Sequence, residues 1–403
     1  MSTSAMSHSS LRLGAGLLSL FCLPALAYAA PQPSIAWTTA LHAPIYNTPQ
    51  ALNGQLYLTS TQADGPNVFA LNGNTGKQLW SFATKGSIAI SPTVSGSQLF
   101  VASDVGDTHF MRAIDTKTGM LIWDYTRDQP PECMCSYQST LVGGLLFAQT
   151  DGHGLYAFQP QDNAPSRRVW SFAGDGALLT SPAAAAGIVV VGSSDRNLYG
   201  LDAKTGKILW QQTTGYAFTA MPVIANGVVV IGDTGGNIDG FALKTGKPLW
   251  SMTANGAINT EAVIAGDTAF VASEDHNIYA LTITTGHVNW QYTMDDFAAF
   301  SPLLAGDELV VDNRAEQLLA LDTKTGKRLW QTNLHATPFS TPLAWSARKA
   351  VVLKLGDHQI AAFNLTTGKI LWNYQTSSVV TEPVIAAGKV DVVTSQGHVL
   401  ALD

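Results

Sequence analysis

Tryptophan recurs along this chain at a nearly fixed interval, and that interval restricts the possible folds more than any other feature. Nine of the ten tryptophans follow one another at spacings of 40 to 47 residues. These nine are Trp37, Trp80, Trp123, Trp170, Trp210, Trp250, Trp290, Trp330 and Trp372. A period near 40 residues indicates copies of one small unit, stacked in a row or arranged in a ring.

Residues 220–250 show what one period contains. Four short apolar runs, AMPVIA, GVVVIG, NIDGFAL and KPLW, are separated by turn sequences that contain Asn-Gly and Thr-Gly. Such runs predict strands, and the glycines allow the positive φ of tight hairpins. No segment repeats its apolar residues every 3.6 positions, so helices should be nearly absent. We expect an all-β chain built from four-stranded antiparallel units, with strands A to D running from the inside outward.

Four-stranded sheets repeated around an axis form a β-propeller, and the units can be counted. Strands A begin near Thr48, Ser91, Ser139, Thr180, Ala220, Thr260, Ser301, Thr341 and Thr381. The last unit reaches Asp403 without a strand D, whereas SIAWTTA (34–40) resembles a strand D with no unit before it. We predict a single nine-bladed propeller over residues 30–403. Pairing of the N-terminal strand with the last three strands closes the ring and removes its open edges. An eight-bladed ring with one displaced unit is the alternative.

The recurring tryptophan falls at the same place in each unit, in strand D after a Thr-Gly-Lys turn, as in LDAKTGKILW (201–210). A tryptophan side chain buries about 150–250 Å². We therefore expect the nine indoles to pack between neighbouring blades. Trp345 stands outside the period, in the A–B turn of the eighth unit, where we expect it to pack against that turn.

The N-terminal 29 residues are typical of a secretory signal peptide. Arg12 precedes the apolar run LGAGLLSLFCLPALA (13–27), and small residues follow at a cleavage site. Phe21 stands before Cys22, where a lipoprotein signal needs a small residue, so we expect no lipid anchor. The mature chain is then periplasmic or secreted, and no later run reaches the roughly 20 apolar residues of a membrane span. The net charge of −7 argues against nucleic acid as a partner.

The pattern (A/L)-x-D-x-x-T-G-K-x-x-W resembles the repeat of pyrroloquinoline-quinone (PQQ) enzymes and of their non-enzymatic relatives, the BamB-like propellers of outer-membrane assembly. The resemblance covers residues 35–403. In the enzymes it implies two adjacent cysteines beside the quinone, a tryptophan floor, a Trp-Asp-x-Asp segment that supplies the base, and calcium ligands. This chain has Cys133-Met134-Cys135, and Trp290 is followed by Gln291 rather than aspartate. We expect no catalytic, cofactor-binding or metal-binding residues. A PQQ-dependent dehydrogenase, or another enzyme that uses Asp295 or Asp296, is the alternative.

In the BamB-like propellers, the resemblance implies a partner-binding loop between blades that contains leucines and an arginine. The corresponding segment here, SFAGDGALLTSP (171–182), has Leu178 and Leu179 but no arginine. We expect an exported scaffold that binds a protein partner in the cell envelope.

The charged residues sort onto two faces of the predicted ring. The A–B and C–D turns form one face, called here the turn face, and the B–C and D–A loops form the other, called the loop face. The turn face collects Lys77, Lys117, Lys204, Lys207, Lys244, Lys247, Lys324, Lys327 and Lys369, whereas acidic residues and histidines collect on the loop face. A face of one sign attracts an oppositely charged partner, although Asp and His are also ordinary turn residues. The candidate partner residues on the loop face are Leu178, Leu179, His153, His276, His358, His398 and Asp275.

Two further features of the loop face leave alternatives open. Cys133 and Cys135 lie in the longest loop between blades and form either a disulfide that stiffens it, or a redox-active or soft-metal pair. Glu261 and Glu382 begin inner strands where most units have Ser-Pro or Thr-Pro. Their carboxylates are expected at the rim of the axial channel, either solvated or pointing into it.

Overall fold

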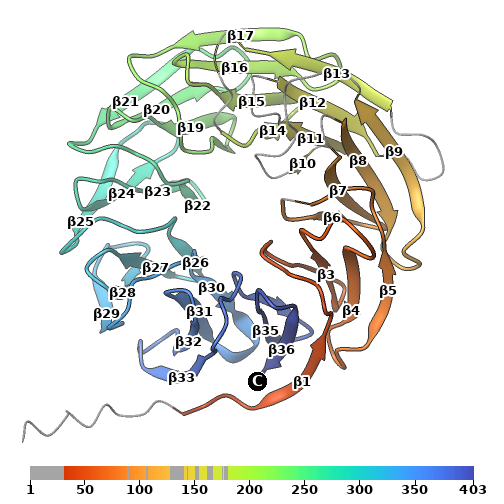
Figure 1. Ribbon diagram of the computed structural model, residues 1–403. Coiled ribbons are helices and arrows are strands. Elements are labelled where there is room, and N and C mark those ends of the chain that lie inside the picture. The colour runs from red at the N-terminus through yellow and green to blue at the C-terminus, as the bar shows by residue number, and fades with distance from the viewer. Residues whose placement is uncertain are drawn as a thin grey trace, which may run out of the picture.

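The chain forms a ring of nine four-stranded antiparallel sheets around a common centre (Figure 1). The computed structural model describes residues 31–403 apart from 89, 106–107, 128–139, 143, 150–153, 161–166, 175 and 177–179. In that part of the chain the only helical element is the 3-10 turn η1 (Ser346–Arg348). The described residues include no helix long and apolar enough to cross a membrane. The predicted nine-bladed all-β propeller is confirmed, and the eight-bladed alternative is wrong.

The first four blades each contain their strands A to D in chain order. Blade 1 has β2 (Gln50–Leu52), β3 (Gln55–Thr59), β4 (Val68–Asn72) and β5 (Gln78–Phe82). Blade 2 has β6 (Thr93–Ser95), β7 (Gln98–Val105), β8 (Thr108–Asp115) and β9 (Leu121–Arg127). Blade 3 has β10 (Thr140–Val142), β11 (Leu145–Gln149), β12 (Gly154–Gln159) and β13 (Arg167–Ala173). Blade 4 has β14 (Ala183–Ala185), β15 (Ile188–Gly192), β16 (Asn197–Asp202) and β17 (Ile208–Thr213).

The next four blades repeat the same order. Blade 5 has β18 (Val223–Ala225), β19 (Val228–Gly232), β20 (Asn237–Ala242) and β21 (Pro248–Thr253). Blade 6 has β22 (Val263–Ala265), β23 (Thr268–Ala272), β24 (Asn277–Thr282) and β25 (Val288–Thr293). Blade 7 has β26 (Leu303–Ala305), β27 (Glu308–Asn313), β28 (Gln317–Asp322) and β29 (Arg328–Asn333). Blade 8 has β30 (Leu343–Trp345), β31 (Ala350–Leu355), β32 (Gln359–Asn364) and β33 (Ile370–Gln375).

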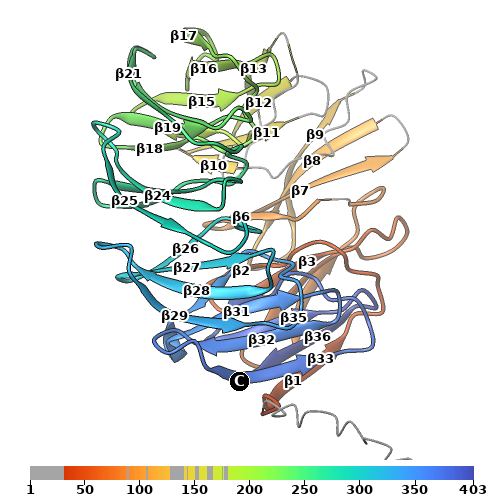
Figure 2. The ribbon, with the colours of Figure 1, turned by 90° about the vertical axis from the view of Figure 1, so that its left-hand side faces the viewer.

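Blade 9 joins the two ends of the chain. It consists of β34 (Val384–Ala386), β35 (Lys389–Val393) and β36 (His398–Leu402), with β1 (Ile35–Ala40) as its strand D. Strands β1 and β36 pair antiparallel, and the Asp403 amide donates to the Ser34 carbonyl at 3.0 Å. Figure 2 shows the two strands together at one edge of the ring. The predicted closure is confirmed.

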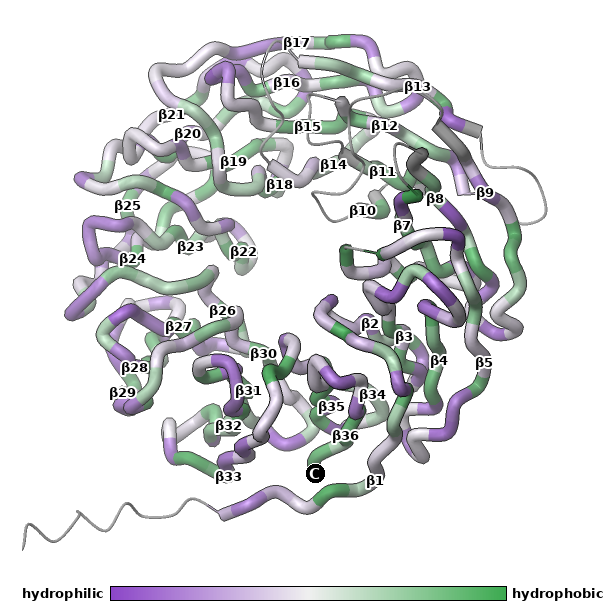
Figure 3. Tube along the Cα trace, viewed as in Figure 1, coloured by the Kyte–Doolittle hydropathy of each residue, from purple (hydrophilic) through white to green (hydrophobic). Residues whose placement is uncertain are grey.

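The apolar residues form clusters between blades instead of one central core. Phe270 and Trp290 of blade 6, for example, pack with Leu309 and Val311 of blade 7. Figure 3 shows apolar stretches distributed over all the blades. Each blade therefore depends on its two neighbours for burial, as in other repeat architectures.

In five of the described C–D turns an Asp or Asn side chain at the end of strand C accepts hydrogen bonds from the turn, whereas blades 5 and 6 have Ala242 and Thr282 there and form the turn with backbone bonds. In blade 4, Asp202 Oδ1 accepts hydrogen bonds from the Lys204 amide (3.1 Å), the Thr205 amide (2.8 Å) and the Thr205 hydroxyl (2.8 Å). The bonds from Thr205 lower the pKa of Asp202. Gly206 follows with a φ of 69°, a value that favours glycine because it lacks a Cβ atom.

The glycine turn receives the indole ring of the preceding blade. Trp210 of blade 4 donates its Nε1 hydrogen to the Leu243 carbonyl of blade 5 at 2.8 Å. A Cβ atom on Gly246 in the same turn would lie 2.6 Å from the Trp210 ring. The equivalent hydrogen bonds, between 2.6 and 3.0 Å, come from Trp37, Trp80, Trp170, Trp250, Trp290 and Trp330. This indole–turn contact is the repeated link between blades.

The remaining tryptophans also lie between blades or turns. Trp123 is buried, and the turn of blade 3 that would face it lies outside the described residues. Trp372 faces blade 9, which has no C–D turn, and there the Asn373 amide donates to the Pro31 carbonyl at 3.1 Å. Trp345 is buried, packs edge-on against Trp372 and donates to the Gly388 carbonyl at 2.9 Å.

One buried carboxyl interrupts the apolar rows at the closure of the ring. In a typical blade a large apolar residue of strand B, a small one of strand C and the tryptophan of strand D lie side by side, as Phe270, Ala280 and Trp290 do. In blade 9 the corresponding row is Asp391, Ala401 and Trp37. Asp391 has no exposed surface, and burial raises its pKa to about 8.

Replacing Gly246 by alanine tests the indole–turn contact. We expect Gly246→Ala to lower the unfolding free energy by about 2–4 kcal/mol, because it combines an unfavourable φ with a clash against Trp210. The matched control is Gly227→Ala, which also has a positive φ of 75° but no atom within 4 Å of the added Cβ. Urea unfolding measures both variants, and equal losses would contradict the contact.

Replacing Asp391 by asparagine tests the buried carboxyl. Between about pH 4 and pH 8, Asp391 is protonated in the folded chain. In the unfolded chain its pKa is near the ordinary value of 4, so it is ionised over the same range. Asp391 therefore lowers the unfolding free energy as pH rises through that range, by up to about 1.4 kcal/mol per pH unit. Asp391→Asn should be more stable than wild type at pH 8 and gain much less at pH 5 in urea unfolding.

Burial also raises the pKa of Asp312, to about 7. Asp312 is present in both the variant and the wild type, so its contribution cancels when the two are compared. Asp202→Asn, at an exposed turn, is the control and should show no such gain at high pH. A gain for Asp391→Asn of equal size at both pH values would contradict a protonated Asp391.

Candidate functional site

The loops of the loop face are tied to the blades by backbone bridges. In the described part of the chain, four D–A loops form one short bridge each with the end of strand B of the blade they enter, as Ala298 does with Asn313 and Val380 with Thr394. Side chains connect successive loops as well. Thr219 donates to Asn259 Oδ1 at 2.8 Å, and Asn259 donates to Glu274 Oε1 at 2.8 Å. The face consequently presents its side chains from fixed backbone positions.

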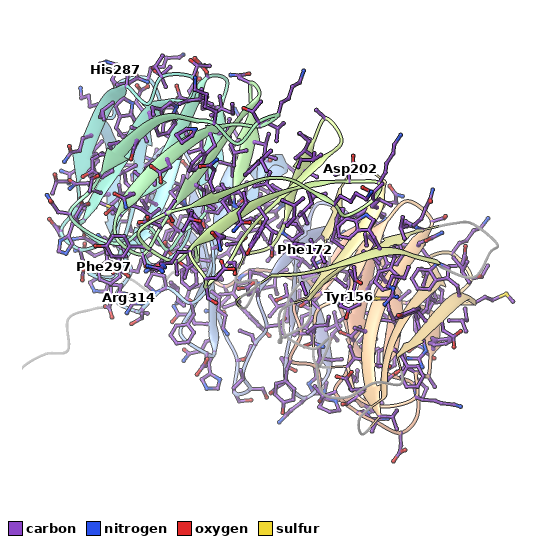
Figure 4. All side chains as sticks on the ribbon, turned by 90° about the horizontal axis from the view of Figure 1, so that it is seen from above. Tyr156, Phe172, Asp202, His287, Phe297 and Arg314 are labelled. Carbon is purple, nitrogen blue, oxygen red and sulfur yellow. The ribbon has the colours of Figure 1, made fainter. Side chains whose placement is uncertain are left out.

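A cluster of four side chains spans blades 6 and 7 on this face. His276 of the B–C turn of blade 6 has its Nε2 atom 3.9 Å from Asp296 Oδ1, and its ring centroid lies 6.2 Å from that of Phe297. The Arg314 guanidinium lies 4.9 Å from the centroid of Phe297 (Figure 4). Phe297 and Arg314 were not among the residues that the sequence singled out. Arg314 could have been noticed in the sequence, because it is a cation in a B–C loop that is otherwise acidic.

Asp275 is engaged within the fold. Its carboxylate accepts hydrogen bonds from the Tyr279 hydroxyl (2.7 Å), the Asn255 amide (2.9 Å) and the Asn277 amide (3.0 Å). Burial opposes ionisation of Asp275, but these hydrogen bonds outweigh it and lower the pKa. Asp275 therefore joins the D–A loop to the B–C turn.

The other predicted histidines are exposed and separate. His358 lies in the B–C turn of blade 8 and His398 at the start of β36. The described part of the chain has no group of three His, Cys, Asp or Glu residues placed to hold a metal ion. Next to His358, Asp357 lies 3.8 Å from the Nζ atom of Lys354, whose side chain is almost fully buried.

Five predicted residues lie outside the described residues. They are His153, Leu178, Leu179, Cys133 and Cys135. The alternatives for the two cysteines, and the partner-binding role of the two leucines, stay predictions.

The two glutamates at the starts of inner strands differ in their surroundings. Glu382 is exposed, accepts a hydrogen bond from Thr48 at 3.4 Å and lines a groove of about 350 Å³ between the inner strands of blades 8, 9 and 1. Glu261 is half-buried, burial raises its pKa, and its amide donates to the Ser301 hydroxyl at 3.1 Å. The carboxylate of Glu382 is therefore accessible from this groove, whereas that of Glu261 is partly withdrawn from solvent.

Exposed apolar side chains flank this groove. Phe339, Val379 and Tyr46 belong to the three successive D–A loops that enter blades 8, 9 and 1, and they are 47%, 39% and 61% exposed. Phe339 precedes Ser340, and Tyr46 comes two residues before Thr48; both Ser340 and Thr48 line the groove. Sequence reasoning missed these three residues, because a single apolar residue in a loop does not show whether it is buried.

The residues that bear on the enzymatic alternative make contacts within and between blades. Trp290 lies between blades 6 and 7, where its Nε1 atom donates to the Thr323 carbonyl at 3.0 Å. Asp295 Oδ2 accepts a hydrogen bond from Gln317 (2.7 Å), and Asp296 Oδ1 accepts one from the Phe297 amide (2.8 Å). The two aspartates on which an enzyme alternative would rest are thus engaged in loop contacts.

The nine-bladed ring, its Thr-Gly-Lys turns and its indole–turn contacts define a propeller of the PQQ-like repeat type. The sequence profile of the family described as outer membrane protein assembly factor BamB matches residues 25–165, 140–261 and 235–403. The chain belongs to this family. No curated protein sequence matches the chain at a significant level.

Solved structures show the same architecture at low sequence identity. BamB from Moraxella catarrhalis is 14% identical with a TM-score of 0.57, covering 92% of this chain and 99% of its own. Sqt1 from Saccharomyces cerevisiae is 11% identical with a TM-score of 0.59, covering 92% and 99%. The quinohemoprotein alcohol dehydrogenase ADHIIG from Pseudomonas putida HK5 is 14% identical with a TM-score of 0.54, covering 92% and 76%. At these identities the likeness is one of fold.

Replacing Asp275 by alanine tests its place in the loop face. We expect the unfolding free energy to fall by about 1–3 kcal/mol, because the variant leaves the Tyr279 hydroxyl and two amides without their acceptor. The control is Asp307→Ala, since Asp307 is 77% exposed and its ion pair with Lys324 contributes little. Thermal unfolding compares the two, and an Asp275→Ala variant as stable as the control would contradict the structural role.

Proposed function

We propose that this protein is an exported, non-catalytic scaffold that binds a protein partner through its loop face. The observation that carries the proposal is that Phe339, Val379 and Tyr46 are exposed in the three D–A loops that lead into the groove containing Glu382. Exposed apolar side chains gathered on a rigid surface and bordered by polar groups are typical of protein-binding sites.

The family supports an envelope role. Its description names an assembly factor for outer-membrane proteins, and we extend that role to this chain as part of the proposal. Residues 1–29, with the composition of a cleavable export signal, place the mature chain in the periplasm under this proposal. The partner docks across blades 8, 9 and 1, and the cluster of His276, Asp296, Phe297 and Arg314 lies on the same face.

Site-specific photo-cross-linking in the native envelope tests the proposal. A photoreactive residue at Phe339 or Tyr46 should form a discrete cross-link to one envelope protein. The matched control positions are Met120 and Leu329, which are also exposed apolar residues, at 68% and 48%, but lie away from the loop face. Equal cross-linking from all four positions, or none from Phe339 and Tyr46, would overturn the loop face as the binding surface.

Quinone titration separates the scaffold from the enzymatic alternative. The purified mature chain, given PQQ with calcium and a dye acceptor, should show no saturable quinone binding and no alcohol-dependent dye reduction, because Trp290, Asp295 and Asp296 are engaged elsewhere. Saturable binding accompanied by dye reduction would replace the scaffold by a dehydrogenase.

A further inference from the structure

Blade 5 departs from its neighbours at one position on the boundary with blade 4. Strand C of blades 4 and 6 places a tyrosine against the preceding blade, Tyr199 and Tyr279. Each hydroxyl donates to an aspartate of its own B–C turn, at 2.6 Å to Asp195 and at 2.7 Å to Asp275. In blade 5 both members of this pair are changed, because Asp239 stands in place of the tyrosine and Gly235 in place of the aspartate.

The missing ring leaves a cavity in the outer wall of the propeller. It has a volume of about 350 Å³ and is lined by residues 212–214 at the end of β17, by Asp239 and Phe241 of β20, and by residues 248–251 of β21. These strands belong to adjacent blades at the outside of the ring (Figure 1). The cavity is separate from the groove at Glu382, which the inner strands of blades 8, 9 and 1 enclose.

The charge in this cavity has no counterion in the described part of the chain. Asp239 is half-buried, and no lysine, arginine or histidine that the structure describes forms an ion pair with it. Burial raises the pKa of Asp239, the Ser251 hydroxyl opposes that rise, and the neighbouring charge of Asp233 adds to it. A cation that entered the cavity would compensate a carboxylate that the fold leaves uncompensated.

The rest of the lining suits a planar cation. Trp250 also lines the cavity, but its indole ring lies on the other side of blade 5, where Nε1 donates to the Ile283 carbonyl of blade 6 at 2.8 Å. A guanidinium forms paired hydrogen bonds with a carboxylate and has further N–H groups for other oxygen acceptors. Thr213, Thr214, Ser251 and the amide of Gln212 supply further oxygen acceptors around the same space.

We propose that the cavity between blades 4 and 5 is a binding site for an arginine side chain of a peptide or protein ligand. Asp239 pairs with the guanidinium, Gln212 and Ser251 accept its remaining hydrogens, and Pro248 and Leu249 contact its aliphatic stem. This site is on the outer wall, so it is independent of the loop face.

Calorimetric titration of the mature chain with N-acetyl-arginine amide tests the site. We expect saturable binding in the millimolar range that weakens with salt, and at least tenfold weaker binding of the neutral citrulline analogue and of N-acetyl-lysine amide. Asp239→Asn should lower the affinity for the arginine probe at least tenfold. Asp239→Tyr restores the ring found in blades 4 and 6, and should abolish binding without lowering the melting temperature.

Asp202→Asn is the matched control, because it removes an exposed carboxylate of blade 4 that lies in a turn outside the cavity. It should bind the arginine probe with wild-type affinity. The site is overturned if wild type shows no saturable binding, if either comparison probe binds as tightly as the arginine probe, or if Asp239→Asn keeps wild-type affinity. None of these results depends on the cross-links from Phe339 and Tyr46, so the two proposals fail separately.

Discussion

The contact between the indole of one blade and the glycine turn of the next is the interaction on which the rest of the structure depends. Each blade is a sheet of four short strands that cannot bury both of its faces alone. The indole ring covers one face, its Nε1 hydrogen finds a carbonyl on the neighbour, and the turn glycine leaves room for the ring. Because one contact of this kind joins each successive pair of blades for which the turn is described, the sequence must keep Trp and Thr-Gly in step every 40 or so residues.

That requirement restricts the residues of the turn face and leaves those of the loop face free to vary. The turn face carries the Thr-Gly-Lys turns, whose residues are committed to the link between blades. The loop face has no such repeated duty, so its residues differ from blade to blade and can form the His276–Arg314 cluster and the groove containing Glu382. In two blades a carboxylate also stands where the neighbouring blades have an apolar or aromatic residue. Asp391 replaces an apolar residue where the ring closes, and Asp239 replaces a tyrosine on the outer wall.

Much of the fold could be predicted from the sequence, because the period of the tryptophans is a one-dimensional property. The number of units predicted nine blades, and the segment 34–40, which has no unit before it, predicted the closure between the termini. The partner of each indole could not be predicted in this way, since Trp210 and Gly246 belong to different units and meet only when the blades are stacked.

The candidate site was harder to predict, because residues of one type in similar loops have different surroundings. Asp275 and His358 both lie in B–C turns, yet Asp275 is engaged by Tyr279, Asn255 and Asn277, whereas His358 is exposed. Burial and hydrogen bonding distinguish them, and neither can be read from loop position. Asp239 is an exception that alignment of the units could have found, because Tyr199, Asp239 and Tyr279 are spaced by 40 residues.

Hydrogen exchange of the backbone amides in residues 37–40 tests the closed nine-bladed ring most directly. If β1 is the outer strand of blade 9, these amides exchange as slowly as those of an outer strand such as β17, because β36 pairs with β1 as β16 pairs with β17. Exchange of residues 37–40 at the rate of an unprotected peptide, while β17 stays protected, would show that the ring is not closed by its termini.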